Sequence, residues 1–236
     1  QHESVSSYNQ YGALIAPDGA LLTSNQVLVS SAADEYWGSP VWLDRSHILA
    51  TWSVNSPGVG NDGSNGAIVV QEFEVIRTTT GDGAGDTINF TSDGLIDRVF
   101  AGAGADIIST GDGSDVIDGQ AGADFMRGGD GNDLYYVDDP GDAIVEDTAN
   151  TAIGGVDRVI SSITYTLPVN VENLTMVGTG NIIGNGNGSN NFMSGNAQAN
   201  TLRAWGGNDV FTPGGGNDWM SGGIGQDYFV FNTALG

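Results

Sequence analysis

Acidic side chains recur at a fixed interval through much of this chain and are its strongest candidates for chemistry. In a first block, five aspartates lie nine residues apart, and in a second block two asparagines and three aspartates keep the same interval. The first set is Asp97, Asp106, Asp115, Asp124 and Asp133, and the second is Asn191, Asn200, Asp209, Asp218 and Asp227. Evenly stacked carboxylates repel one another unless cations lie between them. Oxygen donors suit Ca²⁺ better than Mg²⁺, because Ca²⁺ accepts about six to eight oxygens in flexible geometry.

The residues around the acidic positions predict how the chain brings them together. A nonapeptide of the form Gly-Gly-x-Gly-x-Asp-x-apolar-x recurs, as in residues 128–136, and places the acidic residue at position six. Position eight is apolar in all ten repeats, which predicts a short strand with this side chain pointing inward. The glycines permit the positive φ angles of a tight turn. Two nonapeptides are therefore predicted to form one 18-residue coil of a flattened parallel β-solenoid.

This geometry stacks residues 18 positions apart on the same edge of the solenoid, about 4.8 Å from one another. In the first block the predicted columns are Asp97, Asp115 and Asp133 on one edge, and Asp106 and Asp124 on the other. In the second block they are Asn191, Asp209 and Asp227, and Asn200 and Asp218. The alternative interpretation is a set of glycine- and aspartate-rich surface loops that bind no metal.

The repeats resemble the RTX calcium-binding nonapeptide repeat, most clearly over residues 92–136 and 186–231. The resemblance implies several Ca²⁺ ions, held between stacked turns by position-six aspartates and by turn carbonyls. The implied aspartate ligands are Asp97, Asp106, Asp115, Asp124, Asp133, Asp209, Asp218 and Asp227. The implied carbonyl donors are Gly102, Gly104, Gly111, Gly113, Gly122, Gly129, Gly131, Gly207, Gly214, Gly216, Gly223 and Gly225. The strongest sites are expected where Asp106 meets Asp124, Asp115 meets Asp133, and Asp209 meets Asp227.

Four turns depart from the repeat, and one of them is the turn before Asp97, where Asp93 and Leu95 replace glycines. Asn191 and Asn200 are neutral, and the glycine two residues before each of them is replaced. These two turns are expected to bind Ca²⁺ weakly or not at all and to stack as amide ladders. Residues 80–86 look like an earlier repeat that is out of step, because Asp86 lies eleven residues before Asp97.

The predicted fold class is all-β, a parallel β-roll or β-solenoid of nonapeptide repeats in two blocks, preceded by a small β-rich region. In that region, residues 47–54 and 67–73 are predicted strands, and a faint internal echo suggests the end of a β-repeat array, such as a propeller-like blade. The spacer between the blocks keeps strand-like composition and is expected to continue the solenoid without metal. The four segments are 1–78 (N-terminal region), 79–136 (first block), 137–180 (spacer) and 181–236 (second block).

Composition and motifs exclude several function classes. The formal net charge of −23, with six arginines and no lysine, argues against nucleic acid and against anionic membranes. No Cys is present for disulfides or thiol chemistry, and no apolar run is long enough to insert into a membrane. His2-Glu3 lacks the second histidine of a zinc protease motif, and Asp44, Ser46 and His47 are too close in sequence to converge as a triad. We therefore expect no enzymatic activity in this chain.

Position seven should face outward, yet it is apolar in most repeats, which indicates either self-assembly or a surface partner, or else ordinary β-propensity. These residues are Ile107, Val116, Phe125, Leu134, Phe192, Val210, Trp219 and Tyr228. The resemblance implies a bacterial protein secreted by a type I pathway, of which this chain is expected to be a piece. We expect a calcium-dependent structural module of a cell-surface, adhesin or S-layer-like protein that folds outside the cell. The alternative is the C-terminal calcium-binding and secretion module of a secreted protease, lipase or polysaccharide-modifying enzyme.

Overall fold

A computed structural model describes residues 14–15, 21–22, 35–37, 41–42, 47–54, 67–74, 76–90, 94–146 and 154–231 of the chain. The chain divides into two compact units, Gln1–Arg77 and Thr78–Gly236. Every regular element in these residues is a β-strand, as the sequence predicts. None of the described residues belongs to a helix that could span a membrane.

The first unit contains short antiparallel strands around one long hairpin. Strand β5 (His47–Val54) pairs along its whole length with β6 (Ala67–Glu74), from His47 opposite Glu74 to Val54 opposite Ala67. Both predicted strands are thereby confirmed. The other strands are β1 (Leu14–Ile15) paired with β2 (Leu21–Leu22), and β3 (Glu35–Trp37) and β4 (Val41–Trp42), each paired with β5. Residues 2–3, 44 and 46, which the sequence analysis examined for catalytic motifs, lie outside the described residues.

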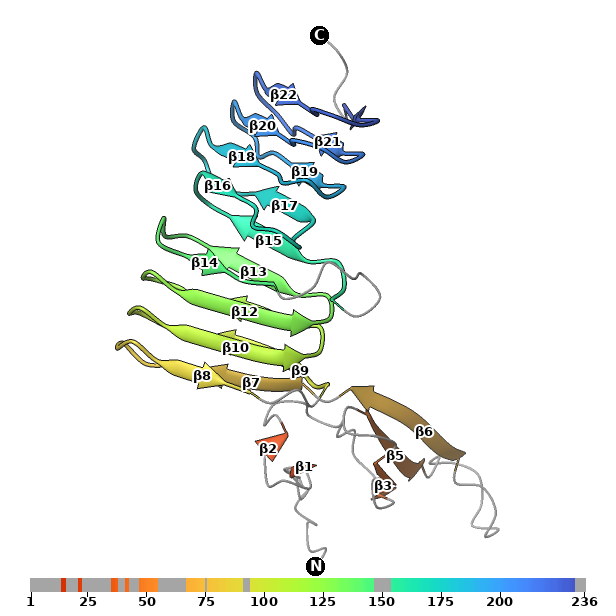
Figure 1. The fold of residues 1–236 in the computed structure, drawn as a ribbon. Coiled ribbons are helices and arrows are strands. Elements are labelled where there is room, and N and C mark those ends of the chain that lie inside the picture. Colours follow the sequence, from red (N-terminus) through yellow and green to blue (C-terminus); the bar gives the residue numbers. More distant parts are fainter. Residues whose placement is uncertain are drawn as a thin grey trace, which may run out of the picture. The chain divides into compact units, whose positions relative to one another are not determined.

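The second unit is a parallel β-solenoid of about eight turns, and Figure 1 shows its strands stacked in order along the chain. One face is a nine-stranded sheet: β7 (Ile76–Thr80), β9 (Ile96–Phe100), β11 (Val116–Asp118), β13 (Leu134–Val137), β15 (Arg158–Ser161), β17 (Asn173–Met176), β19 (Phe192–Ser194), β21 (Val210–Thr212) and β23 (Tyr228–Phe229). The other face has two four-stranded sheets. The first is β8 (Thr87–Asn89), β10 (Ile107–Asp112), β12 (Phe125–Asp130) and β14 (Ala143–Ile144). The second is β16 (Tyr165–Thr166), β18 (Ile183–Asn185), β20 (Thr201–Arg203) and β22 (Trp219–Ser221).

Strand register confirms the 18-residue coil in both blocks. Val116 pairs with Leu134 in the first block, and Val210 pairs with Tyr228 in the second. The spacer continues the stack, as predicted, but its coils are irregular. Leu134 pairs with Arg158, 24 residues later, and Arg158 pairs with Asn173, only 15 residues later. The nine-stranded sheet therefore continues while the opposite face is interrupted between β14 and β16.

Position-eight side chains form the core, as their apolar character predicts. Eight of the ten are fully buried: Val99, Ile108, Ile117, Met126, Tyr135, Met193, Leu202 and Phe211. Met220 is partly buried against this cluster. Phe229 stacks on Phe211 with ring centroids 5.0 Å apart, yet it stays 42% exposed because no further coil covers it among the described residues.

Candidate metal sites

The position-six aspartates of the first block stack into two ladders, one on each edge of the solenoid. In the first ladder the backbone N–H of Asp97 donates to Oδ1 of Asp115 at 2.8 Å, and that of Asp115 donates to Oδ1 of Asp133 at 2.8 Å. In the second ladder the N–H of Asp106 donates to Oδ1 of Asp124 at 2.9 Å. Each carboxylate thus accepts a hydrogen bond from the residue 18 positions earlier, and the predicted columns are present.

The second block repeats this arrangement. The backbone N–H of Asn191 donates to Oδ1 of Asp209 at 2.7 Å, and that of Asp209 donates to Oδ1 of Asp227 at 3.1 Å. On the opposite edge the N–H of Asn200 donates to Oδ1 of Asp218 at 2.8 Å. The three pairs expected to form the strongest sites are therefore each brought together.

The second ladder extends beyond the predicted residues at both ends. The backbone N–H of Asp86 donates to Oδ1 of Asp106 at 2.6 Å, so the out-of-step repeat joins this edge despite its 20-residue offset. At the other end the N–H of Asp124 donates to Oδ1 of Asp142 at 3.1 Å. Asp142 lies nine residues after Asp133, so the interval alone could have identified it.

The first ladder also continues, through the spacer. Asp133 donates its N–H to Oδ1 of Asp157 at 2.8 Å, and Asp157 donates to Oε2 of Glu172 at 2.9 Å. Sequence reasoning missed both acceptors. The signal for Asp157 was available, because residues 157–159 repeat the Asp-Arg-Val of residues 97–99.

Several ladder carboxylates have one oxygen that the protein leaves without a partner. Oδ2 of Asp106, Asp124, Asp133 and Asp209 is buried and has no hydrogen bond, and each of these residues is at most 2% exposed. Burial, reinforced by neighbouring carboxylates, raises the pKa of Asp133 to about 8, and it also raises the pKa of Asp124 and Asp209. A buried charge of this kind is costly unless it is paired or coordinates a cation.

The turn glycines lie directly against oxygen atoms of neighbouring turns and of the ladder carboxylates. All twelve predicted carbonyl donors have a φ between 86° and 146°, which glycine adopts readily. A Cβ on Gly122 would overlap the carbonyl oxygen of Gly104 in the adjacent turn. A Cβ on Gly119 would overlap Oδ2 of Asp124. Both positions therefore require glycine, since the backbone lies directly against the oxygen atoms of the site.

The donor set fits Ca²⁺. The atoms on offer are carboxylate and carbonyl oxygens, and the unpartnered buried carboxylate oxygens need positive charge. When bound, Ca²⁺ would supply that charge between successive turns. The structural evidence for Ca²⁺ binding is strongest at four aspartates, because each has a buried carboxylate oxygen with no hydrogen-bond donor from the protein. These are Asp106, Asp124, Asp133 and Asp209.

The turn that carries Asn191 is hydrogen-bonded by its own side chains, whereas the side-chain nitrogen of Asn200 is buried without a hydrogen-bond partner. The side-chain nitrogen of Asn191 donates to the carbonyl of Glu172 at 3.0 Å and to Oδ1 of Asn187 at 3.1 Å. The side-chain nitrogen of Asn187 donates to the carbonyls of Pro168 and Val171 at 2.6 and 2.7 Å.

The comparisons with known proteins agree with this geometry. A family model described as the RTX calcium-binding nonapeptide repeat (4 copies) matches residues 94–137, 185–220 and 214–229. These ranges contain all eight aspartates that the sequence resemblance implied as ligands. No curated protein and no solved structure matches the chain. The two blocks are RTX calcium-binding nonapeptide repeats, and the solenoid that they build is an RTX β-roll.

Proposed function

We propose that this chain is the calcium-dependent structural module of a secreted cell-surface protein of the adhesin or S-layer type, and that it folds on binding several Ca²⁺ ions outside the cell. One observation carries the proposal: Oδ2 of Asp106, Asp124, Asp133 and Asp209 is buried without a partner in the folded state. Folding without a cation would enclose these charges uncompensated. The matched calcium-binding repeats support the identity of the ion.

The available Ca²⁺ concentration would then decide where the module folds. Extracellular calcium modules typically have a Kd of about 10⁻⁴–10⁻³ M. At about 1 mM Ca²⁺ and a Kd of about 0.1 mM, each site stabilises the folded state by roughly 1.4 kcal/mol. A domain's entire free energy of unfolding is only about 5–15 kcal/mol, so a few sites decide whether the chain folds. Inside a cell, where free Ca²⁺ is far scarcer, the same chain would stay unfolded and fit for export.

Circular dichroism on the decalcified full chain tests this function. Titration with Ca²⁺ is expected to produce a cooperative transition from coil to β-structure in the sub-millimolar to millimolar range, and Mg²⁺ is expected to produce none. A spectrum that is already β-rich and indifferent to Ca²⁺ would overturn the proposal.

Exposed apolar side chains support a structural role through self-assembly or a surface partner. Ile107 and Phe125 are neighbours on β10 and β12 and are 53% and 41% exposed. Trp219 on β22 is 52% exposed, with the Arg203 guanidinium 5.2 Å from its ring centre. Trp219→Ser is expected to weaken assembly in calcium without unfolding the module. Sedimentation of the variant and the wild type checks this, and unchanged association would contradict it.

A further inference from the structure

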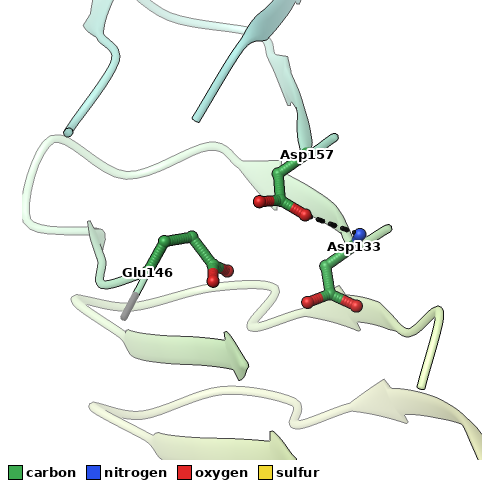
Figure 2. Close-up of side chains that lie close together, drawn as sticks. All are labelled: Asp133, Glu146 and Asp157. Carbon is green, nitrogen blue, oxygen red and sulfur yellow. Dashed lines mark hydrogen bonds between the residues drawn. The ribbon is translucent and has the colours of Figure 1, made fainter. Parts of the chain in front are cut away.

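Three buried carboxylates converge where the regular 18-residue coil is interrupted (Figure 2). Asp133 directly precedes β13, Glu146 follows β14, and Asp157 precedes β15. Their exposed fractions are 2%, 6% and 1%. One oxygen from each lies within 4.8 Å of the other two. Glu146 belongs to the irregular 24-residue coil and lies outside the ranges that match the repeat family.

Hydrogen bonds hold the two aspartates of this cluster in place, but one carboxylate oxygen of Asp133 accepts none. Oδ1 of Asp133 accepts the N–H of Asp115, and Oδ1 of Asp157 accepts the N–H of Asp133. Oδ2 of Asp133 is buried and has no hydrogen-bond partner. This orphaned oxygen is an observation separate from the clustering of acids, and it indicates that a ligand bearing positive charge belongs there.

Tyr135 holds the third carboxylate in place. Its hydroxyl accepts the N–H of Gly128 at 2.6 Å and donates its proton to the Glu146 carboxylate. Burial, and then the charge of Glu146, raise the pKa of Tyr135, so the phenol keeps its proton and remains a donor. This hydrogen bond orients Glu146 within the cluster but supplies no full positive charge.

Basic side chains do not supply that charge from the interior. Among the arginines whose burial the structure describes, Arg77 is half-buried and the rest are exposed, namely Arg98, Arg127, Arg158 and Arg203. The chain contains no lysine. Three buried acids without a buried base require protons or a metal cation at neutral pH.

We propose that Asp133, Glu146 and Asp157 bind one Ca²⁺ ion at the junction between the first block and the spacer. One oxygen from each carboxylate lies within 4.8 Å of the other two, which is close enough for one Ca²⁺ ion, whose opposite ligands lie about 4.6–5.2 Å apart, to contact all three. Mg²⁺ usually keeps several waters and binds through one or two carboxylates, so a set of three carboxylates suits Ca²⁺ better. This junction site takes three carboxylate side chains, including one that no repeat provides. It rests on the proposed function because it uses the same ion.

The junction site has a consequence for the fold. An ion there ties β13 to β15 across the 24-residue insertion and holds the segment after β14 against the first ladder. Three acidic ligands bind Ca²⁺ more tightly than two, so this site is expected to fill before the turn sites. For its first coil, this proposal differs from the expectation from sequence of a spacer without metal.

The test compares the full chain with its Glu146→Gln variant, using a competing chromophoric calcium chelator to count ions and rank their affinities. The variant is expected to lose one Ca²⁺ per chain, the tightest one. Glutamine keeps an oxygen for the Tyr135 hydroxyl, so the hydrogen bond survives. The matched control is Asp218→Asn, which removes a ladder carboxylate in the second block and should leave the tightest ion in place.

Tb³⁺ luminescence gives a second readout that a purely structural role would not change. A Tb³⁺ ion in the junction site would lie beside the Tyr135 ring, so excitation of tyrosine should sensitise its emission. Tyr135→Phe is expected to reduce this emission even at saturating Tb³⁺, because the variant lacks the phenol, and to weaken binding of the ion, because Glu146 loses its hydrogen bond. Tyr136→Phe, at the neighbouring and more exposed position, should leave the emission as it is.

The stability of the decalcified Glu146→Gln variant shows whether a lost ion reflects a lost ligand or a misfolded chain. Glu146→Gln removes one charge from a buried acidic cluster, so the decalcified variant should be at least as stable as decalcified wild type. Identical ion counts and affinities in variant and wild type would overturn the junction site while leaving calcium-dependent folding intact. Loss of a tight ion in Glu146→Gln, in a chain whose folding ignores Ca²⁺, would instead uphold the junction site and overturn the proposed function.

Discussion

The turns of the first block and the turns that open the second block differ in whether the chain itself supplies a hydrogen bond to an equivalent side-chain oxygen at position six. In the asparagine turns, the N–H of Asn187 donates to Oδ1 of Asn191 at 2.9 Å, and the N–H of Asn196 donates to Oδ1 of Asn200 at 2.8 Å. In the aspartate turns the equivalent oxygen is left without a hydrogen bond, as at Asp124. One solenoid therefore contains turns whose side-chain oxygen is satisfied by the chain and turns whose buried carboxylate oxygen calls for a cation.

The backbone differs at the same place. Position two has a positive φ in four aspartate turns of the first block, at Gly102, Gly111, Gln120 and Gly129. Asn187 and Asn196, at position two of the asparagine turns, do not adopt this conformation. The Asp209 turn shows that the conformation is not the only cause, because its position two is Trp205 and its Oδ2 is still unpartnered.

Asp142 marks the end of cation-type turns in the second ladder. The backbone N–H groups of Asp138 and Asp139 both donate to Oδ2 of Asp142 at 3.1 Å. This carboxylate is thus satisfied by the chain, like the amides of the asparagine turns. An aspartate at position six is therefore not enough for a cation site, because its second oxygen must also be free of hydrogen bonds from the chain.

Removal of calcium should separate the two kinds of turn most strongly. In decalcified protein, backbone amides around Asp106, Asp124 and Asp133 are expected to lose hydrogen-exchange protection by orders of magnitude. Amides around Asn191 and Asn200 should lose least, because their side-chain hydrogen bonds need no ion. Hydrogen exchange with peptide-level mass spectrometry measures both regions in one sample. Equal loss in both regions would contradict the division.

Substitution of Asn by Asp, and of Asp by Asn, at position six should change the stability of the chain, and its dependence on calcium, in opposite ways. Asn191→Asp would point a carboxylate at the carbonyl of Glu172 and at Oδ1 of Asn187, so we expect a loss of about 3 kcal/mol in the free energy of unfolding that calcium does not restore. Asp124→Asn removes a buried charge, so it should stabilise the decalcified chain and reduce the gain on adding calcium. Denaturant unfolding with and without calcium measures all four free energies.

The matched pair in this experiment guards against a general effect of substitution. A loss in Asn191→Asp that calcium repairs would show that the asparagine turn can accept an ion and that its neutrality is incidental. An Asp124→Asn variant as calcium-responsive as wild type would remove Asp124 from the ligands.

A lower pH should stabilise the folded chain when calcium is absent and destabilise it when calcium is bound. Burial raises the pKa of both Asp133 and Asp157 to about 8, above the unfolded value of 3.8. Without calcium, the stability that these groups contribute is fully present below about pH 4 and is lost as the pH rises through about 8. With calcium the order is reversed, because protons compete with the ion for the same oxygens. Thermal unfolding of decalcified and calcium-loaded protein between about pH 5 and pH 8 checks both signs.

The nine-residue interval predicts the repeated parts of this fold because its signal is local. Each repeat carries its own turn glycines, acidic residue and inward apolar residue, so Ile117 and Asp115 can be placed without knowing any other coil. Glu146 could not be placed in this way. Its position depends on a 24-residue coil folding back until β15 pairs with β13, and no spacing within the segment encodes that distance.

The asparagines at position six show a second limit of prediction from sequence. The neutral side chains of Asn191 and Asn200 indicate weak calcium binding, and that expectation remains a prediction. The proposed amide ladder takes a different form, because Asn191 bonds within its own turn and to the carbonyl of Glu172. A ladder of amide oxygens does form one position earlier, where the backbone N–H of Asn208 donates to Oδ1 of Asn190 at 2.7 Å. Side-chain direction at adjacent positions decides between these outcomes, and the residue types alone do not encode it.

The smallest expected effect concerns two glutamines, each of which donates its backbone N–H to the side chain two residues earlier. They differ in backbone conformation. The N–H of Gln120 donates to Oδ1 of Asp118 at 3.0 Å, and that of Gln198 donates to Oδ1 of Asn196 at 2.8 Å. Gln120 has a φ of 63°, whereas the φ of Gln198 is not positive. Gln120→Gly should therefore stabilise the calcium-bound chain by about 0.5 kcal/mol, because release of left-handed strain outweighs the entropy that glycine adds to the unfolded chain.

Gln198→Gly is the matched control, and it should destabilise the chain by about 0.5 kcal/mol, since only the entropic cost applies there. Urea unfolding in saturating calcium measures both variants against wild type. Opposite signs would show that the left-handed φ of Gln120, at position two of the Asp124 turn, carries strain that is absent at Gln198, at position four of the Asn200 turn. The same sign at both positions would mean that the positive φ of Gln120 has no energetic weight, and the contrast between the two kinds of turn would then depend on their side chains alone.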